Sequence, residues 1–245
     1  MRSDIATVIW KERKELGRQP GSRWRLGLAL LVPILYFGII GPWQTGAEWY
    51  SSLDSVLIAV VAPLLVVMLT VPDSFAGERE RKTLATLLAT RLDDRAILVG
   101  KVMFNVALGW GMALATLIVG MMAANVTNWS GTVRVIPAWL LATDVALSLG
   151  VAVLTAGLGV LLSMRSASVQ QTQQVLAAAL LLPLTVAGPL LLIIAGDEPG
   201  AMRRMFGNVD ARSLAFWAVI TVAGVGVFLL WLAVRRFTRH RLAER

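Results

Sequence analysis

Apolar residues along this chain gather into six long stretches separated by short polar segments. A helix needs about 20 predominantly apolar residues to cross a hydrocarbon core of roughly 30 Å. Because backbone polar groups in lipid need partners within their own segment, each stretch is predicted to be a membrane-spanning helix. The expected spans are residues 26–43, 53–72, 102–124, 135–163, 175–195 and 213–234.

The composition favours a membrane protein over a soluble domain. The chain is 57% hydrophobic and has a mean hydropathy of +0.70, well above an ordinary soluble domain. Its basic beginning and first apolar stretch resemble a secretory signal, but no small-residue cleavage site follows and five more spans do. We therefore expect an all-α membrane protein with a cytoplasmic lead (1–25), one transmembrane domain (26–234) and a basic tail (235–245).

The basic residues are distributed unevenly between the polar segments. Lys and Arg number seven in residues 1–25 and six in residues 73–101, but none in 44–52 and one in 125–134. The positive-inside rule therefore places both termini and the 73–101 segment in the cytoplasm. The net charge of +8 is thus a topology signal that suits an anionic lipid surface, and we expect no nucleic-acid partner.

The sequence excludes several kinds of chemistry. It has no cysteine and one histidine, His240 in the basic tail, so thiolate catalysis and metal sites built on cysteine or histidine clusters are not expected. No phosphate-binding loop is present either, because Gly100-Lys101 lacks a glycine five positions earlier. We therefore predict no catalytic residue, no metal ligand and no cofactor bound by this chain, which is not expected to be an enzyme.

The lead before the first span has the pattern of an amphipathic helix. Ile5, Val8 and Ile9 follow helical spacing, although Glu12 interrupts the apolar row. The opposite face is basic and carries Lys11, Arg13, Lys14 and Arg18. Such a helix is typical of the membrane interface, with its basic residues outward. The alternative is a frayed segment that serves only as a topology signal.

The segment 73–101 is the most strongly patterned polar part of the chain. Residues 78–90 are predicted to form a helix, because Leu84, Leu87 and Leu88 share one apolar face. An exposed leucine patch at the membrane surface suits docking into a groove of another protein. A helix lying flat on lipid explains the same pattern equally well.

Polar residues at both ends of this segment predict where its helices begin. Asp73 or Ser74 is suited to cap the 78–90 helix, and Asp93-Asp94 offers a cap to a second helix that continues through Lys101 into the third span. The segment is therefore expected to contain one separate helix followed by an extension of the third span.

The sequence Glu78-Arg-Glu-Arg-Lys-Thr-Leu-x-x-Leu-Leu-x-Thr90, followed by Gly100-Lys101, resembles the cytoplasmic loop of ABC-2 type transporter permeases. The six-span layout, the amphipathic lead and the Leu182-Pro183 and Gly188-Pro189 steps of the fifth span are similar to that family as well. In the family, this segment forms the coupling helix that contacts the ATPase subunit. The chain departs from the family pattern at Lys82 and Ala85, and at Arg91, where a proline is usual.

The resemblance implies the permease subunit of an exporter in a bacterial or archaeal cytoplasmic membrane. Two copies of a separate ABC ATPase subunit would bind ATP and Mg, and a second permease subunit, identical or not, would complete the complex in the lipid bilayer. The residues implied to contact the ATPase are Glu78, Arg79, Glu80, Arg81, Thr83, Leu84, Leu87, Leu88, Gly100 and Lys101.

Two polar residues lie inside the expected spans. Asp144 is the clear acid within a span, and Asn105 is a weaker candidate for a functional polar residue. A carboxylate at such depth normally faces protein or water, and Ser148, Ala152 and Ala156 continue its face as a stripe that allows close helix packing. Asp144 is therefore either a pathway or ion-sensing group or a helix-packing group.

Two other functions remain compatible with these features. One is an ion-coupled carrier that uses Asp144, and the other is a non-transporting scaffold that recruits a cytoplasmic partner through the 78–90 segment.

Overall fold

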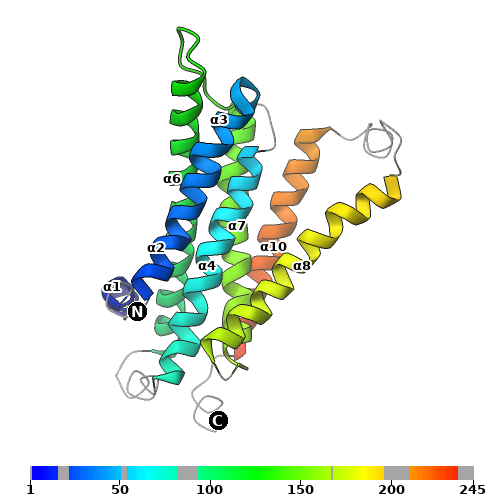
Figure 1. Ribbon diagram of the computed structural model, residues 1–245. Coiled ribbons are helices and arrows are strands. Elements are labelled where there is room, and N and C mark those ends of the chain that lie inside the picture. Colours follow the sequence, from blue (N-terminus) through cyan, green and yellow to red (C-terminus); the bar gives the residue numbers. More distant parts are fainter. Residues whose placement is uncertain are drawn as a thin grey trace.

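The computed structural model describes residues 2–15, 22–50, 54–81, 93–166, 168–195 and 210–236. Within these ranges all regular structure is helical, which confirms the predicted all-α class (Figure 1). The elements are α1 (Arg2–Glu15), α2 (Ser22–Pro33), the π-helix η1 (Ile34–Ile40), α3 (Gly41–Thr45), the 3₁₀-helix η2 (Gly46–Tyr50), α4 (Asp54–Glu80), α6 (Asp94–Thr127), α7 (Ala138–Ser163), α8 (Val169–Ala195) and α10 (Ala211–Arg236).

Several helices are long and apolar enough to cross a membrane. In the described part of the chain these segments are Leu30–Tyr50, Asp54–Glu80, Asp94–Thr127, Ala138–Ser163 and Arg212–Arg236. They coincide with five of the six predicted spans. The remaining span, 175–195, falls within α8, so the count of six and the cytoplasmic position of the termini stay predictions.

The first of these segments changes helix type three times before it ends. Pro42 lies in the first turn of α3, and Gly46 ends that helix with a positive φ of 65°, a conformation that glycine adopts without the steric cost of a side chain. The chain then buries Trp49 against α6, where a Cβ on Gly120 would lie 2.7 Å from the indole ring. The segment Leu30–Tyr50 therefore ends in a short 3₁₀-helix that packs against α6 through Trp49.

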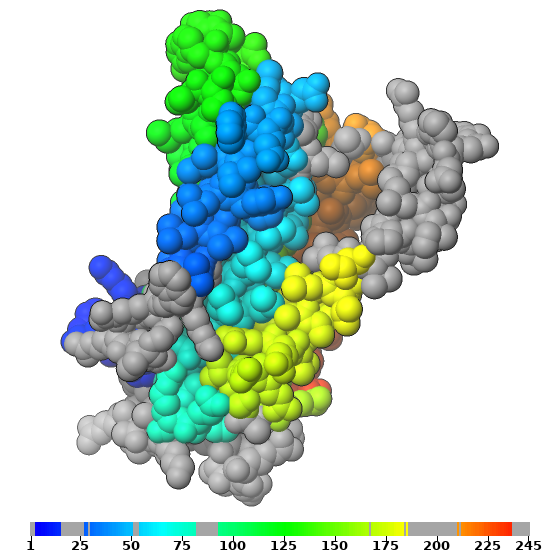
Figure 2. Space-filling view, in the orientation of Figure 1, coloured from blue at the N-terminus to red at the C-terminus, as the bar shows by residue number. Residues whose placement is uncertain are grey.

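Helix α7 lies at the centre of the bundle. Its Ala152 and Ala156 pack in one apolar cluster with Val67 and Val71 of α4 and with Ala233 of α10. Figure 1 shows α4, α6, α7 and α10 side by side, whereas α8 leans away from them toward its C-terminal end. In the space-filling view of Figure 2, α4 remains visible between α2 and α8. The stripe that continues from Asp144 is therefore buried between helices, as expected.

Helices α7 and α10 approach each other closely through glycines. A Cβ on Gly226 would lie 2.8 Å from the backbone nitrogen of Leu154, and one on Gly157 would lie 2.9 Å from the Cβ of Leu229. Real Cβ atoms do not approach other heavy atoms this closely, so any side chain here would force the helices apart. Glycines thus set the distance between these two helices.

We expect Gly226→Ala to destabilise the protein by about 1–3 kcal/mol, the usual cost of overpacking a tight contact. Gly224, two residues earlier on the same helix, has open space where its Cβ would lie. The control Gly224→Ala should therefore leave stability unchanged or raise it by up to about 1 kcal/mol through helix propensity. Thermal unfolding in detergent compares the two variants, and equal midpoints would contradict the proposed contact.

Candidate functional site

The predicted separate helix does not begin at Asp73 or Ser74, because α4 continues unbroken to Glu80. Ser74 does not cap a new helix: its hydroxyl donates to Glu12 Oε2 at 2.9 Å, and the amide of Asn105 donates to it at 3.1 Å. The other predicted cap is confirmed. Asp93 precedes α6 and accepts a hydrogen bond from the backbone nitrogen of Arg95.

Helix α1 is docked onto the first turns of α6. Val8 is buried against Ile97, and a Cβ on Gly100 would lie 2.8 Å from the Val8 side chain. The missing side chain at Gly100 therefore lets α1 cross α6 at short range. Figure 1 views α1 nearly end-on beside the ends of α6 and α2, so its axis crosses the bundle.

This crossing encloses a charged cluster that we call the junction, formed by Lys11, Glu12, Ser74, Glu78, Lys101 and Asn105. At its centre Lys101 is only 1% exposed. Its Nζ lies 2.7 Å from Glu12 Oε1, 2.9 Å from Glu78 Oε1 and 2.8 Å from the carbonyl oxygen of Ser74. An ammonium group has three protons to donate, and α1 and α4 supply an acceptor for each.

The junction explains the glutamate that interrupts the apolar face of α1. Glu12 is 5% exposed and Glu78 is 3% exposed, and burying either charge unpaired would be costly. The two carboxylates meet the ammonium of Lys101, and Asn105 completes the cluster by donating to the carbonyl of Lys101 at 2.8 Å. Asn105 also donates to the Ser74 hydroxyl of α4 at 3.1 Å, so it links α6 to α4, and a role in a transport pathway stays a prediction.

Lys11 joins the same cluster from the outer side. Its Nζ lies 2.6 Å from Glu78 Oε1 and 3.3 Å from Glu15 Oε2, which corrects the prediction that Lys11 belongs to the exposed basic face of α1. Partial burial lowers the pKa of Lys11, but the neighbouring carboxylates, Glu78 foremost, outweigh that effect and hold the pKa above the ordinary value of 10.5. This pairing therefore stabilises the fold fully below pH 10.5 and is lost as the pH rises through the raised pKa.

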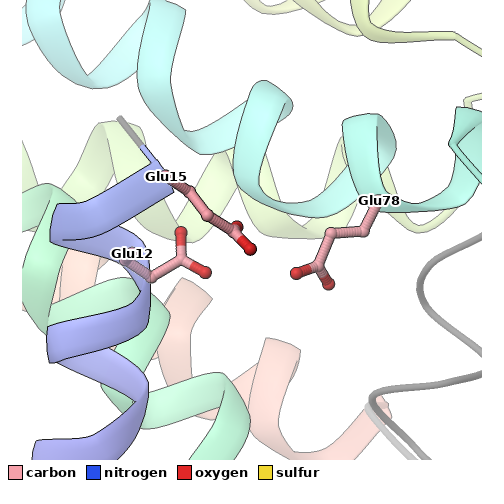
Figure 3. A group of neighbouring side chains, drawn as sticks. All are labelled: Glu12, Glu15 and Glu78. Atoms are coloured by element: carbon pink, nitrogen blue, oxygen red, sulfur yellow. The ribbon is translucent and has the colours of Figure 1, made fainter. Parts of the chain in front are cut away.

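Three carboxylates of this region point toward one another (Figure 3). Oxygens of Glu12, Glu15 and Glu78 lie within 4.8 Å of one another, a spacing that would suit a divalent cation. However, the ammonium groups of Lys11 and Lys101 already contact these carboxylates. The arrangement therefore fits a salt-bridge network better than a metal centre.

The residues that follow Glu78 reach other helices. The guanidinium of Arg79 donates to the carbonyls of Ser166 and Met164, just after the end of α7. Glu80 accepts a hydrogen bond from the backbone nitrogen of Val169, the first residue of α8. Arg81 turns back to pair with Asp73 at 2.7 Å on α4 itself.

The structure distributes the predicted ATPase-contact residues between three situations. Glu78, Gly100 and Lys101 are buried in contacts between helices, so they are not surface groups in this arrangement. Glu80 and Arg81 are exposed and Arg79 is half-buried. The other four, Thr83, Leu84, Leu87 and Leu88, lie outside the described residues, as does most of the predicted 78–90 helix.

Asp144 lies apart from the junction, in α7 at the interface with α4. It is fully buried, so it faces protein, as expected for an acid in a span. The hydroxyl of Ser55 on α4 lies beside its carboxyl, yet among the described residues neither carboxylate oxygen has a hydrogen bond of ordinary geometry. The role of Asp144, as a pathway or ion-sensing group or as a helix-packing group, therefore stays a prediction.

We expect Lys101→Met to destabilise the protein by about 3–5 kcal/mol, because it leaves Glu12 and Glu78 buried without their central counter-charge. The control Lys14→Met removes an exposed lysine of α1 that lies over the Trp10 ring, and its cost should stay near 1 kcal/mol or below. The double variant Glu12→Gln, Lys101→Met should cost less than the two single changes together. Thermal unfolding in detergent compares Lys101→Met, Glu12→Gln, their double variant and the control Lys14→Met, and equal effects of the two lysine variants would contradict the junction.

Sequence comparison connects this architecture with a known family. The family model for ABC-2 type transporters matches residues 3–205, a range that begins within α1 and includes the whole junction. No curated protein matches the chain in sequence. Because the match covers most of the chain, this multi-pass membrane protein belongs to the ABC-2 type transporter family, whose members are the membrane permease components of ABC transporters.

Proposed function

We propose that this chain is the permease subunit of an ABC exporter that is driven by a separate ATPase subunit. Its family supports a transport role, and its sequence contains no phosphate-binding loop. ATP and Mg are therefore bound by the partner. The same proposal places two ATPase subunits on the cytoplasmic side of a pair of permease subunits in a bacterial or archaeal cytoplasmic membrane.

The ATPase would dock on the segment between α4 and α6. This segment comprises residues 82–92 with their leucines, together with the exposed Arg81 that precedes them, whereas Arg79 and Glu80 contact the turn between α7 and α8. The buried junction is the observation that carries the proposal. Because Lys101 of α6 is bound to Glu78 of α4 at 2.9 Å, a force on the segment between these helices reaches both of them as one unit.

Transport would follow from two arrangements of this unit. ATP-driven approach of the two ATPase subunits pushes on the docking segment, and the joined ends of α4 and α6 tilt together with α1. Rigid-body tilting of this kind is a common way for a transporter to alternate between its two open states. An ion-coupled carrier remains the competing function, and the fully buried carboxyl of Asp144 is the observation that favours it.

The partner is tested first by affinity purification of the tagged chain from native membranes. We expect a stoichiometric ATPase with a phosphate-binding loop, identified by mass spectrometry and by ATP hydrolysis. The variant Leu84→Ser, Leu87→Ser, Leu88→Ser should lose at least about tenfold in the amount of co-purified ATPase, because it removes the apolar anchors of the docking segment.

A matched control separates docking from folding. Leu182→Ser changes an exposed leucine of α8 far along the chain from the docking segment, and it should leave co-purification intact. A wild-type chain that purifies folded but alone would refute the exporter proposal and would favour the ion-coupled carrier.

The Asp144→Asn variant distinguishes the exporter from the ion-coupled carrier. The exporter proposal predicts that this variant keeps at least about half of the ATPase activity and retains the bound partner, because Asp144 lies beside Ser55 near the start of α4, whereas the junction lies at the end of that helix. A carrier instead requires the carboxylate, so the variant would abolish ion binding measured by calorimetry on the purified protein. Ion binding by the wild type that disappears in Asp144→Asn would therefore contradict the exporter proposal.

A further inference from the structure

Three consecutive residues at the end of α4 point to three different neighbours. Successive residues of an α-helix are rotated by about 100° around its axis, so Glu78, Arg79 and Glu80 spread around the helix end. Glu78 binds Lys101 and Lys11, whereas the next two residues reach the turn that joins α7 to α8. The end of α4 is therefore connected to four other helices within three residues.

Arg79 contacts the C-terminal end of α7. The last carbonyl groups of a helix lack partners within the helix, and they carry the negative end of its dipole. The Arg79 guanidinium lies 3.0 Å from the carbonyl oxygen of Ser166 and 3.5 Å from that of Met164. Ser166 and Met164 both lie just beyond Ser163, the last residue of α7, so the positive charge stands close to the negative end of the α7 dipole.

Glu80 contacts the beginning of α8 with the opposite charge. Its Oε1 lies 3.3 Å from the backbone nitrogen of Val169, at the positive end of the α8 dipole. One turn later, the amide of Gln173 donates to the carbonyl of Leu69 on α4 at 3.3 Å. The positively charged Arg79 therefore faces the end of α7, and the negatively charged Glu80 faces the start of α8.

These ties differ in strength from the junction on the other side of α4. The junction is buried, so water screens its ion pairs little. The contact of Glu80 with α8 is exposed and longer, so water screens it more. Consequently the exposed polar contact of α8 with α4 is weaker than the ion pairs between α6 and α4, and Figure 1 shows α8 as the helix that diverges from the bundle.

We propose that Arg79 and Glu80 are positioning residues that transmit movement of the α4 end to the α7–α8 turn, so that an ATPase stroke on the docking segment changes the angle of α8. This inference rests on the proposed function. The buried junction moves α1, α4 and α6 as one body, and the Arg79 and Glu80 contacts pass part of that movement to α8.

The test is the charge exchange Arg79→Glu, Glu80→Arg in the full-length chain. The exchange keeps the composition and the net charge, but it places a like charge at each helix end. Hydrogen exchange of the purified chain should become about tenfold faster in the first turn of α8, which corresponds to about 1.4 kcal/mol of lost stabilisation, while α10 stays unchanged. The conservative variant Arg79→Lys, Glu80→Asp should restore most of the protection. Equal hydrogen-exchange rates in the wild type and in the charge-exchanged variant would show that Arg79 and Glu80 do not stabilise the start of α8.

Transmission is tested on the complex with its ATPase, with and without ATP and vanadate. In the wild type we expect nucleotide to alter hydrogen exchange in α8 by at least about threefold. In the charge-exchanged variant this response should disappear, although the ATPase still co-purifies and hydrolyses ATP. An unchanged response would overturn the inference and leave the exporter proposal standing. If the wild-type chain binds no ATPase, both the exporter proposal and the proposed transmission of movement to α8 are overturned. Hydrogen exchange of the purified chain alone would still show whether Arg79 and Glu80 hold the start of α8.

Discussion

The structure depends on the burial of one lysine charge. Lys101 carries an ammonium group into a site that is 1% exposed, and such a charge is tolerated only where its hydrogen bonds are complete. Glu12, Glu78 and Ser74 complete them, and in doing so they determine where α1, α4 and α6 meet. Separating these helices would leave the ammonium group and its carboxylate partners buried without each other, which is strongly unfavourable.

The contacts on the two sides of α4 therefore differ. The side that faces α1 and α6 is the stiff side, and the side that faces α8 has weaker polar contacts. On the stiff side, buried ion pairs and the close approach of Val8 to Gly100 hold α1 against α6. On the other side, α8 meets α4 through exposed or half-buried polar contacts near Val169 and Gln173. The two kinds of contact lie on different faces of the same helix end, because Glu78 binds the junction whereas Arg79 and Glu80 bind the α7–α8 turn.

The sequence was sufficient to predict the helical class, five of the spans and the cap at Asp93, because hydropathy and capping are local signals. It was not sufficient to predict the junction, since Glu12 and Lys101 are 89 residues apart and nothing local pairs them. The one local signal was Glu12, which interrupts the apolar face of α1. The structure shows that this glutamate is buried because it pairs with Lys101. The resemblance implies ATPase contacts at Glu78, Gly100 and Lys101, and no local pattern shows that these three residues are buried between helices.

The long separation between Glu12 and Lys101 also bears on the biogenesis of the protein. Helix α1 leaves the ribosome before α6, and its counter-charge on α6 is made only after two further apolar segments. Until then Glu12 has to stay hydrated at the membrane surface, which is where a short amphipathic helix resides naturally. The hairpin of α4 and α6 can pair Glu78 with Lys101 as soon as it is inserted, and α1 then closes over it. Helix α1 is therefore made before α4 and α6, but it takes its final position only after both of them are in place.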